Sequence, residues 1–161
     1  MLKRFLNRAD EEAGFTLIEL MVVVLIIGIL IAIALPTFLG ARERAQNRAA
    51  QSSLRNALVA AKTAYTDTSD YSTATTTNLP TIEPSLTYNA AGTASTGPNV
   101  VSVAITGATQ GVWSAAALSD SGDCYWISDD ATGAGTGTKY GSGAACTGTA
   151  ASTGATLPAF P

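Results

Sequence analysis

Hydrophobic residues are concentrated near the N-terminus of the chain. Residues 1–14 are rich in charge, and in the apolar segment that follows only Thr16 and Glu19 are polar, with no polar side chain over residues 20–35. As an α-helix, residues 15–35 would be about 31 Å long, which is enough to span the hydrocarbon core of a bilayer. The pattern therefore predicts a helix that is apolar on all sides.

A second, amphipathic helical segment follows. Alanines recur through residues 41–64, and apolar side chains at helical spacing form one stripe of Ala50, Leu54, Ala57, Leu58, Ala61 and Tyr65. The charged side chains lie largely off this stripe; they are Arg42, Glu43, Arg48, Arg55 and Lys62. We therefore expect one helix over about residues 15–65. Its first half would pack against other helices or lipid, and its second half would pack the stripe on the chain's own C-terminal domain.

Two residues interrupt the apolar half of this helix. Gly28 lowers helix stability by about 1 kcal/mol, and Pro36, which removes a backbone hydrogen bond, by about 3 kcal/mol. The simplest expectation is a kink at Pro36.

The chain changes character after Tyr65. Residues 66–98 read as a loop region in which three prolines bar a long helix, and short alternating segments follow. We predict an antiparallel sheet of three or four strands, at residues 99–106, 112–118 and 124–127, with a further short strand at residues 86–88. The helix stripe would cover this sheet, with Trp113 and Trp126 in the sheet core. The predicted fold class is α+β, a long N-terminal helix packed against a small antiparallel sheet.

Residues 131–148 are a low-complexity tract of Gly, Thr, Ala and Ser. Such a composition buries little apolar surface, so we expect a mobile surface loop. The tract does not match a phosphate-binding loop, which requires a Gly-Lys-Ser/Thr ending.

Composition excludes several classes of function. The 161 residues include no histidine, which rules out Ser-His-Asp and Cys-His catalysis and histidine-bound metals. The net charge of −3 disfavours a nucleic-acid partner. The two cysteines are too few for a Cys₄ zinc site but sufficient for one disulfide. No catalytic residues and no cofactor are predicted.

Four acidic residues cluster around the last predicted strand, namely Asp120, Asp123, Asp129 and Asp130. Calcium binds where several oxygen ligands converge, so these residues are weak candidates for a calcium site. Their spacing fits no recognised calcium loop, and the sequence favours solvated acids in turns.

Three interpretations compete for the N-terminal segment. A secretory signal has an apolar core of about 7–15 residues, which is shorter than this one. A plain membrane anchor explains the length but not Glu19, because a carboxylate at the centre of a membrane helix costs about 2.5–3.5 kcal/mol. The third interpretation is a leader that is cut before the apolar segment, which then stays in the mature protein.

The residues favour the third interpretation through a resemblance. The motif Gly14-Phe15-Thr16-Leu17-Ile18-Glu19, followed by the apolar run through Gly28 and Pro36, resembles the class III signal of the type IV pilin (prepilin) family. The resemblance covers about residues 1–70 and implies the pilin ladle fold. It also implies that a membrane-embedded prepilin peptidase cleaves between Gly14 and Phe15 and methylates the new N-terminus at Phe15.

The proposed cut has an electrostatic consequence. It creates an α-amine at Phe15, which is charged at neutral pH because its pKa is about 8. This amine is poorly placed for its own Glu19, whereas a neighbouring, axially staggered subunit can offer its amine to that carboxylate and offset the cost of burying it. Phe15 and Glu19 are therefore the predicted assembly residues. The alternative is that Glu19 reaches the lipid headgroups.

The resemblance suggests a domain organisation. Residues 1–14 would be the leader, 15–36 the transmembrane and filament-core half of the helix, 37–66 its amphipathic half, and 67–161 a C-terminal β domain. Gly28 and Pro36 would let residues 28–36 stretch or melt in a filament, where the freed backbone groups can be satisfied. In an exported domain, Cys124 and Cys146 are expected to form a disulfide that closes the loop 124–146 and stabilises it by about 3 kcal/mol; the alternative is two free thiols.

The predicted function is structural: a subunit that polymerises through its N-terminal helix into a cell-surface type IV pilus for adhesion, twitching motility or DNA uptake. The precursor would sit in the cytoplasmic membrane with its N-terminus in the cytoplasm, and its partners would be other copies, the peptidase and the pilus assembly machinery. The alternatives are a pseudopilin of a type II secretion or competence system, a minor pilin, and a membrane-anchored adhesin. A disulfide favours the pilin, and a calcium site would favour the secretion pseudopilin.

Overall fold

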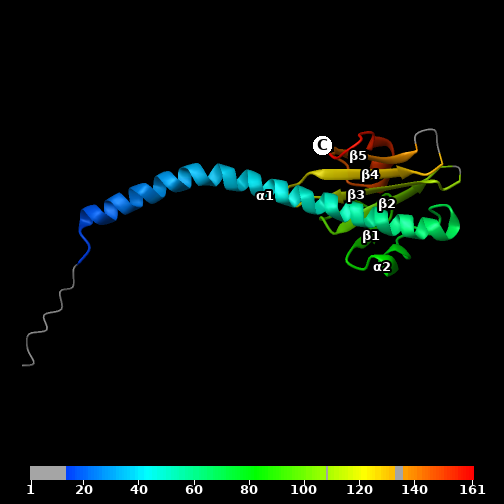
Figure 1. Ribbon diagram of the computed structural model, residues 1–161, viewed down its shortest axis with the longest axis horizontal. Helices are drawn as coiled ribbons and strands as arrows, with labels where there is room; N and C mark the ends of the chain where they lie inside the picture. Colours follow the sequence, from blue (N-terminus) through cyan, green and yellow to red (C-terminus); the bar gives the residue numbers. More distant parts are fainter. Residues whose placement is uncertain (1–13, 108, 133–135) are drawn as a thin grey trace, which may run out of the picture. The chain divides into compact units, whose positions relative to one another are not determined.

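The computed structural model describes residues 14–107, 109–132 and 136–161 (Figure 1). The elements, in chain order, are α1 (Leu17–Thr68), α2 (Leu79–Ile82), β1 (Thr87–Asn89), β2 (Val100–Thr106), β3 (Val112–Leu118), β4 (Cys124–Asp130), β5 (Gly137–Gly143) and α3 (Gly148–Gly154). The chain divides into two structural units, Met1–Gly40 and Ala41–Pro161, and α1 contributes to both.

The predicted long helix is confirmed, with α1 running without a break through Gly28 and Pro36. Pro36 has no N–H, so the carbonyl of Ala32 loses its usual helical donor. At the next residue, the Thr37 Oγ1 donates to the carbonyl oxygen of Ala34 at 2.8 Å. The helix is therefore formed at both of the residues that lower its intrinsic stability, Gly28 and Pro36.

The sheet has five strands in the order β1-β2-β3-β4-β5. The meander from β2 to β4 is antiparallel, as predicted, and β5, which was not predicted, adds to it in the antiparallel sense. The short strand β1, however, pairs with β2 in parallel, with Tyr88 opposite Val101. The connection over residues 90–99 is long enough to carry the chain back along the sheet, which a tight hairpin turn cannot do.

The prediction of a mobile loop over residues 131–148 is wrong for residues 137–143. Gly137–Gly143 forms β5, which pairs with β4 from Cys124 opposite Gly143 to Asp130 opposite Gly137. Apolar burial in this strand comes from its neighbour, because the Trp126 ring lies so close that a Cβ at Gly143 or Gly154 would overlap it. Two of the glycines in the low-complexity tract, Gly141 and Gly143, therefore leave room for the indole.

α1 covers one face of the sheet within the second unit. The buried residues of α1 are Ala50, Ser53, Leu54, Ala57, Leu58, Ala60, Ala61 and Ala64, which confirms the predicted stripe. They pack in one core with Val101, Trp113 and Ile127, which point to the same face of β2, β3 and β4. Trp113 is fully buried there, in agreement with its predicted place in the sheet core.

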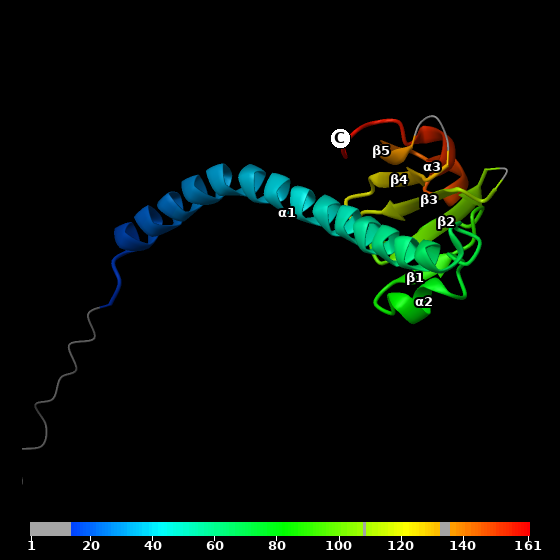
Figure 2. The same ribbon diagram turned by 45° about the vertical axis from the view of Figure 1, so that its right-hand side comes forward.

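The opposite face of the sheet is covered by α3, a helix that the sequence pattern did not reveal (Figure 2). Small side chains let its backbone come close: a Cβ at Gly148 would lie 2.6 Å from the backbone nitrogen of Ala104. The Gly148 N–H donates to the Ser102 Oγ at 2.8 Å. A second apolar cluster forms here from Ala116, Cys124, Cys146 and Ala151, with Trp126 packed against it.

Candidate functional site

The start of α1 is closed by a reciprocal pair of hydrogen bonds between Thr16 and Glu19. The Thr16 backbone N–H donates to the Glu19 Oε2 at 2.9 Å, and the Glu19 backbone N–H donates to the Thr16 Oγ1 at 3.2 Å. The Thr16 hydroxyl also donates to the Glu19 Oε2 at 2.7 Å. This arrangement is a capping box, which satisfies two helix N–H groups that have no partner within the helix.

This capping role was not predicted, although the spacing Thr-x-x-Glu before an apolar run is its sequence signature. The sequence predicts Glu19 as a carboxylate that needs a cation, and its Oε2 accepts two hydrogen bonds from Thr16. The Oε1 makes no hydrogen bond or ion pair within the described part of the chain. The cap therefore fixes the side chain and leaves one carboxylate oxygen available to a cation.

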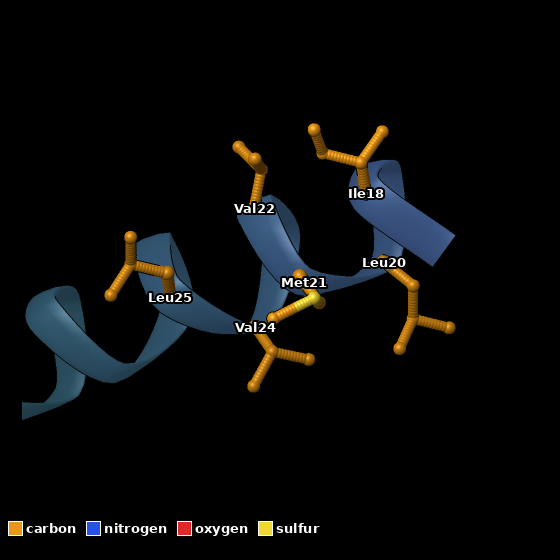
Figure 3. Close-up of a pocket in the computed structure, with 6 residues that line it drawn as sticks. All are labelled: Ile18, Leu20, Met21, Val22, Val24 and Leu25. Atoms are coloured by element: carbon orange, nitrogen blue, oxygen red, sulfur yellow. The ribbon is translucent and has the colours of Figure 1, made fainter. Parts of the chain in front are cut away.

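The helix that follows presents apolar side chains on every side. Phe15 is 84% exposed and Leu25 63% exposed, and all the large hydrophobic residues of this segment up to Leu39 are exposed. Figure 3 shows Ile18 and Val22 on one side of the helix, and Leu20 and Val24 on the other. α1 holds a stretch whose length and hydropathy suffice to cross a membrane. An unpartnered apolar surface of this extent marks a site for lipid or other protein chains.

The predicted cleavage site lies just before the helix. Residues 14–16 have no regular secondary structure, and Gly14 and Phe15 are exposed. Residues 1–13 of the predicted leader lie outside the described residues. The two predicted flexible positions, Gly28 and Pro36, lie well inside α1. The structure thus places Phe15 and Glu19 together at the helix start, with the two helix-weakening residues further along.

The predicted disulfide is present. Cys124 at the start of β4 is bonded to Cys146, which lies just before α3, with the two Cα atoms 5.4 Å apart. Both cysteines are buried. The disulfide therefore joins β4 to the segment that leads into α3, the helix on the second face of the sheet.

The four candidate calcium ligands do not converge. Asp129 is buried and faces α1, whereas the Asp123 Oδ2 accepts a hydrogen bond from Asn47 at 3.2 Å in the turn after β3. Asp130 accepts from the Thr132 N–H at 2.9 Å. In residues 14–107, 109–132 and 136–161, no three His, Cys, Asp or Glu side chains are grouped so that they could hold a metal ion. The geometry gives no support to the calcium interpretation.

Asp129 is instead the centre of a buried polar cluster. Its Oδ1 lies 2.9 Å from the Lys62 Nζ and accepts from the Thr138 hydroxyl at 2.6 Å, while its Oδ2 accepts from the Tyr71 hydroxyl at 2.5 Å. Burial favours a raised pKa for Asp129, but the bonds from Thr138, Tyr71 and Lys62 outweigh it and lower the pKa. Burial and the bond to Asp129 raise the pKa of Tyr71. The cluster holds an ionised carboxylate between α1 and the sheet, a contact that the sequence analysis did not foresee.

Comparisons with known proteins point to the N-terminal segment. Residues 11–35 match a family described as the prokaryotic N-terminal methylation motif. The chain is 46% identical over 62 residues to the type IV major pilin protein PilA of Myxococcus xanthus. The aligned residues are 38% of this chain and 28% of that protein. It is 41% identical over 56 residues to the type II secretion system core protein G of Escherichia coli, covering 33% of this chain and 39% of that protein.

These matches confirm the resemblance to the type IV pilin family. They also show that the similarity extends over only part of the chain. The chain matches well under half the length of both relatives. No solved structure is significantly similar to the chain. The family match over residues 11–35 covers the segment that holds Phe15, Glu19 and much of the apolar helix.

Proposed function

We propose that this chain, a relative of type IV pilins and pseudopilins in its N-terminal segment, is a structural subunit of a type IV pilus. It would be made as a membrane-anchored precursor and would polymerise through its N-terminal helix into a cell-surface filament. One observation carries the proposal: a methylation motif opens a helix whose apolar side chains are exposed throughout, and a carboxylate stands in its first turn. Such a surface requires either lipid or other copies to cover it.

Processing would begin at the exposed Gly14–Phe15 peptide bond. A prepilin peptidase would hydrolyse this bond with one water, leaving a carboxylate on Gly14 and an amine on Phe15. The amine, as its neutral form, would then take a methyl group from a sulfonium methyl donor, which leaves as the thioether, and one proton would be released. A methylated amine is still protonated at neutral pH, so the positive charge is kept. Because residues 14–16 precede the helix, the cut would not require unwinding of α1.

Assembly would then pair two charges from different copies. The amine at Phe15 of one subunit would approach the free Oε1 of Glu19 in its neighbour, while the Oε2 stays bonded to Thr16. Burying Glu19 alone among apolar helices is expensive, and a cation with good geometry offsets most of that cost. Cleavage would therefore switch the helix from membrane anchor to filament core.

The proposal includes a location and partners. The precursor would lie in the cytoplasmic membrane with its N-terminus in the cytoplasm, and residues 67–161 would lie outside, where a disulfide is stable. Its partners would be other copies of the chain, the prepilin peptidase and the pilus assembly machinery. We expect no enzymatic activity and no cofactor. In a filament, residues 28–36 would stretch where Gly28 and Pro36 weaken the helix.

The second candidate is a pseudopilin of a secretion or competence system. It is favoured by the 41% identity over 56 residues to the type II secretion system core protein G. A pseudopilin would share the cleavage site and the assembly residues but would remain in a short structure at the membrane. The location of the processed chain therefore separates the two candidates.

The test is mass spectrometry on filaments sheared from the cell surface and on the membrane fraction. A species that begins at Phe15, carries one methyl group and dominates the sheared material is the result expected for a pilus subunit. The same species confined to the membrane would support the pseudopilin. An unprocessed chain in cells with an active prepilin peptidase would refute both.

Glu19→Gln provides the matching test of assembly. The amide can keep the bonds that its oxygen accepts from Thr16 but cannot pair with a cation. We expect processing at Gly14 to continue and filaments to be lost. Filament yield equal to that of the wild-type chain would show that the carboxylate charge has no role in assembly, and Thr16→Val, which removes only the cap hydroxyl, is the control.

A further inference from the structure

Charge is divided sharply within the second structural unit. The cations Arg42, Arg44, Arg48, Arg55 and Lys62 all lie on α1, where Glu43 is the acidic residue among them. The sequence after Lys62 is predominantly acidic, with Asp67, Asp70, Glu83, Asp120, Asp123, Asp129 and Asp130 against Lys139. A basic helix segment is therefore attached to an acidic domain.

Most of these cations share one face of the helix. At about 100° per residue, Arg44, Arg48, Arg55 and Lys62 fall within an arc of about 40°, on the side away from the buried stripe. Val59 lies on the same side and is 65% exposed. We call these five residues the basic face. A shallow hollow of about 350 Å³ lined by Val59, Lys62, Thr63 and Thr66 continues it towards the end of α1.

The two ends of the basic face differ in their partners. Towards the C-terminal end, Lys62 is paired with Asp129, and the Arg55 guanidinium lies 5.0 Å from the centre of the Phe160 ring. At the other end, Arg44 and Arg48 are exposed and have no ion pair, hydrogen bond or ring contact in the part of the chain that the structure describes. The fold therefore leaves two neighbouring guanidinium groups unpartnered.

We propose that the basic face is an interface for a second copy of the chain, in which Arg44 and Arg48 contact Asp67 and Asp70 of that copy. This inference rests on the proposed function, because it requires copies to pack side by side in a filament. Asp67 is exposed and unpaired among the described residues, and the Asp70 carboxylate is bonded only to its near neighbours in the chain, Ser72 and Thr68. Opposite charges at such a contact orient the partner and disfavour wrong registers.

Helix geometry requires the contact to be between copies. Arg48 and Asp67 are 19 residues apart on one continuous helix, which is about 29 Å at 1.5 Å per residue, so they cannot meet within one chain. A parallel copy displaced along the helix axis by about that distance would bring them together. The two surfaces are different, so the contact is head-to-tail and repeats, as a filament requires.

The stagger distinguishes this contact from two others. The Phe15–Glu19 contact needs a displacement of only a few residues, and in a helical polymer it would involve a different neighbour. Asp120 and Asp123 lie in the turn after β3 that is bonded to Asn47, at the same level of α1 as Arg44 and Arg48. If Arg44 and Arg48 paired with Asp120 and Asp123 of another copy, the two copies would have to lie side by side without axial displacement. Asp120 therefore serves as the control position for Asp67 in the experiments below.

Cysteine cross-linking in the full chain tests the register directly. Both native cysteines are held in the disulfide, so a new pair reports only the new contact. Chains carrying both Arg48→Cys and Asp67→Cys should give a ladder of disulfide-linked multimers from sheared filaments. Arg42→Cys with Asp67→Cys should give none, because Arg42 points to another side of the helix. A ladder from the Arg42 pair, or none from the Arg48 pair in intact filaments, would overturn the inference.

Charge exchange tests the electrostatics. Arg44→Glu with Arg48→Glu should lower the yield of sheared filaments about tenfold, an effect equivalent to about 1.4 kcal/mol. Adding Asp67→Lys should restore the yield, whereas adding Asp120→Lys should not. All these side chains are exposed, and processing at Gly14 reports that each chain reaches the membrane. Unchanged yield after the double reversal, or rescue by Asp120→Lys instead, would refute the assigned pairing. If the wild-type chain forms no filaments, the proposed function fails, and this inference fails with it.

Discussion

A single carboxylate, Asp129, joins the helix to the sheet in the second unit. It is 4% exposed, and three groups bond to it: Lys62 from α1, Tyr71 from the loop after α1, and Thr138 from β5. Hydrogen bonds to a charged group contribute about 1.5–3 kcal/mol each when both partners are held in place. The cluster therefore stabilises the packing of three segments that are distant in sequence.

Asp129→Asn should lower the free energy of unfolding by about 1–3 kcal/mol, because the amide keeps the shape but loses the charge. The loss stays within that range because Lys62, which is half exposed, regains water. Chemical denaturation of the detergent-solubilised chain, with and without the substitution, measures the difference. Lys62→Met is the control and should cost less, because the bonds from Tyr71 and Thr138 remain.

The pH dependence of stability gives a second readout of the same residue. The folded-state pKa of Asp129 lies below its usual value of about 3.9, so its contribution is fully present above about pH 4 and is lost as the pH falls through the folded pKa. Part of the wild-type loss of stability in acid should therefore be missing in Asp129→Asn. Parallel acid profiles for the two chains would contradict this role.

At the scale of elements, β5 can pack against β4 because its glycines leave room for the large Trp126 side chain. Trp126 of β4 lies against Gly143, Gly154 and Gly141, and its Nε1 donates to the carbonyl of Ala145 at 3.0 Å. The strand has little apolar surface of its own, so the indole supplies the burial and the β4 ladder supplies the hydrogen bonds.

Gly143→Ala should therefore destabilise the domain by about 1–3 kcal/mol, since the new methyl group must displace the Trp126 ring. Gly97→Ala is the matched control, because a Cβ there meets no atom within 4 Å. Thermal unfolding of the two variants measures the difference. In a double-mutant cycle, Gly143→Ala should destabilise a Trp126→Leu chain much less than it destabilises the wild-type chain. Equal melting temperatures for Gly143→Ala and Gly97→Ala would be inconsistent with this packing.

The same strand shows where prediction from sequence ends. Period-2 alternation in residues 99–106 predicted β2, the apolar run after the break at Gln110 and Gly111 predicted β3, and the spacing of Ala50, Leu54 and Ala61 predicted the buried side of α1. These signals are local. β5 and α3 consist of Gly, Ser, Thr and Ala with Lys139 and Tyr140, and their order depends on Trp126 and on the disulfide. Such long-range partners leave no periodic pattern.

The candidate site was predictable to a different degree. The motif around Glu19 was evident because it is contiguous, and its cap could have been found from the Thr16–Glu19 spacing. The pairing of Lys62 with Asp129 could not, because the two residues are 67 positions apart and each has an ordinary surface interpretation. Contiguous chemistry is readable from one sequence, whereas contacts across the fold are not.

At the scale of the whole molecule, the two units are stabilised by different means. The described residues of the first unit form a helix whose apolar side chains are exposed, so partners must stabilise it. The second unit buries its own core under α1 and carries a second cluster under α3. Cys124 and Cys146 belong to that second cluster, so the disulfide helps to hold α3 against the face of the sheet opposite α1.

Replacing both cysteines, Cys124→Ser with Cys146→Ser, should therefore lower the free energy of unfolding by about 3 kcal/mol, from the loss of a constraint across 22 residues. The loss should be uneven. α3 has seven residues and small side chains, so without the bond to β4 it should detach first. Hydrogen exchange should become faster in α3 and β5, while the amides of α1 near Leu54 and Ala57 stay protected. A uniform rise in exchange across the domain would instead indicate that the disulfide stabilises both faces of the sheet equally, and that α3 is not a separate cover.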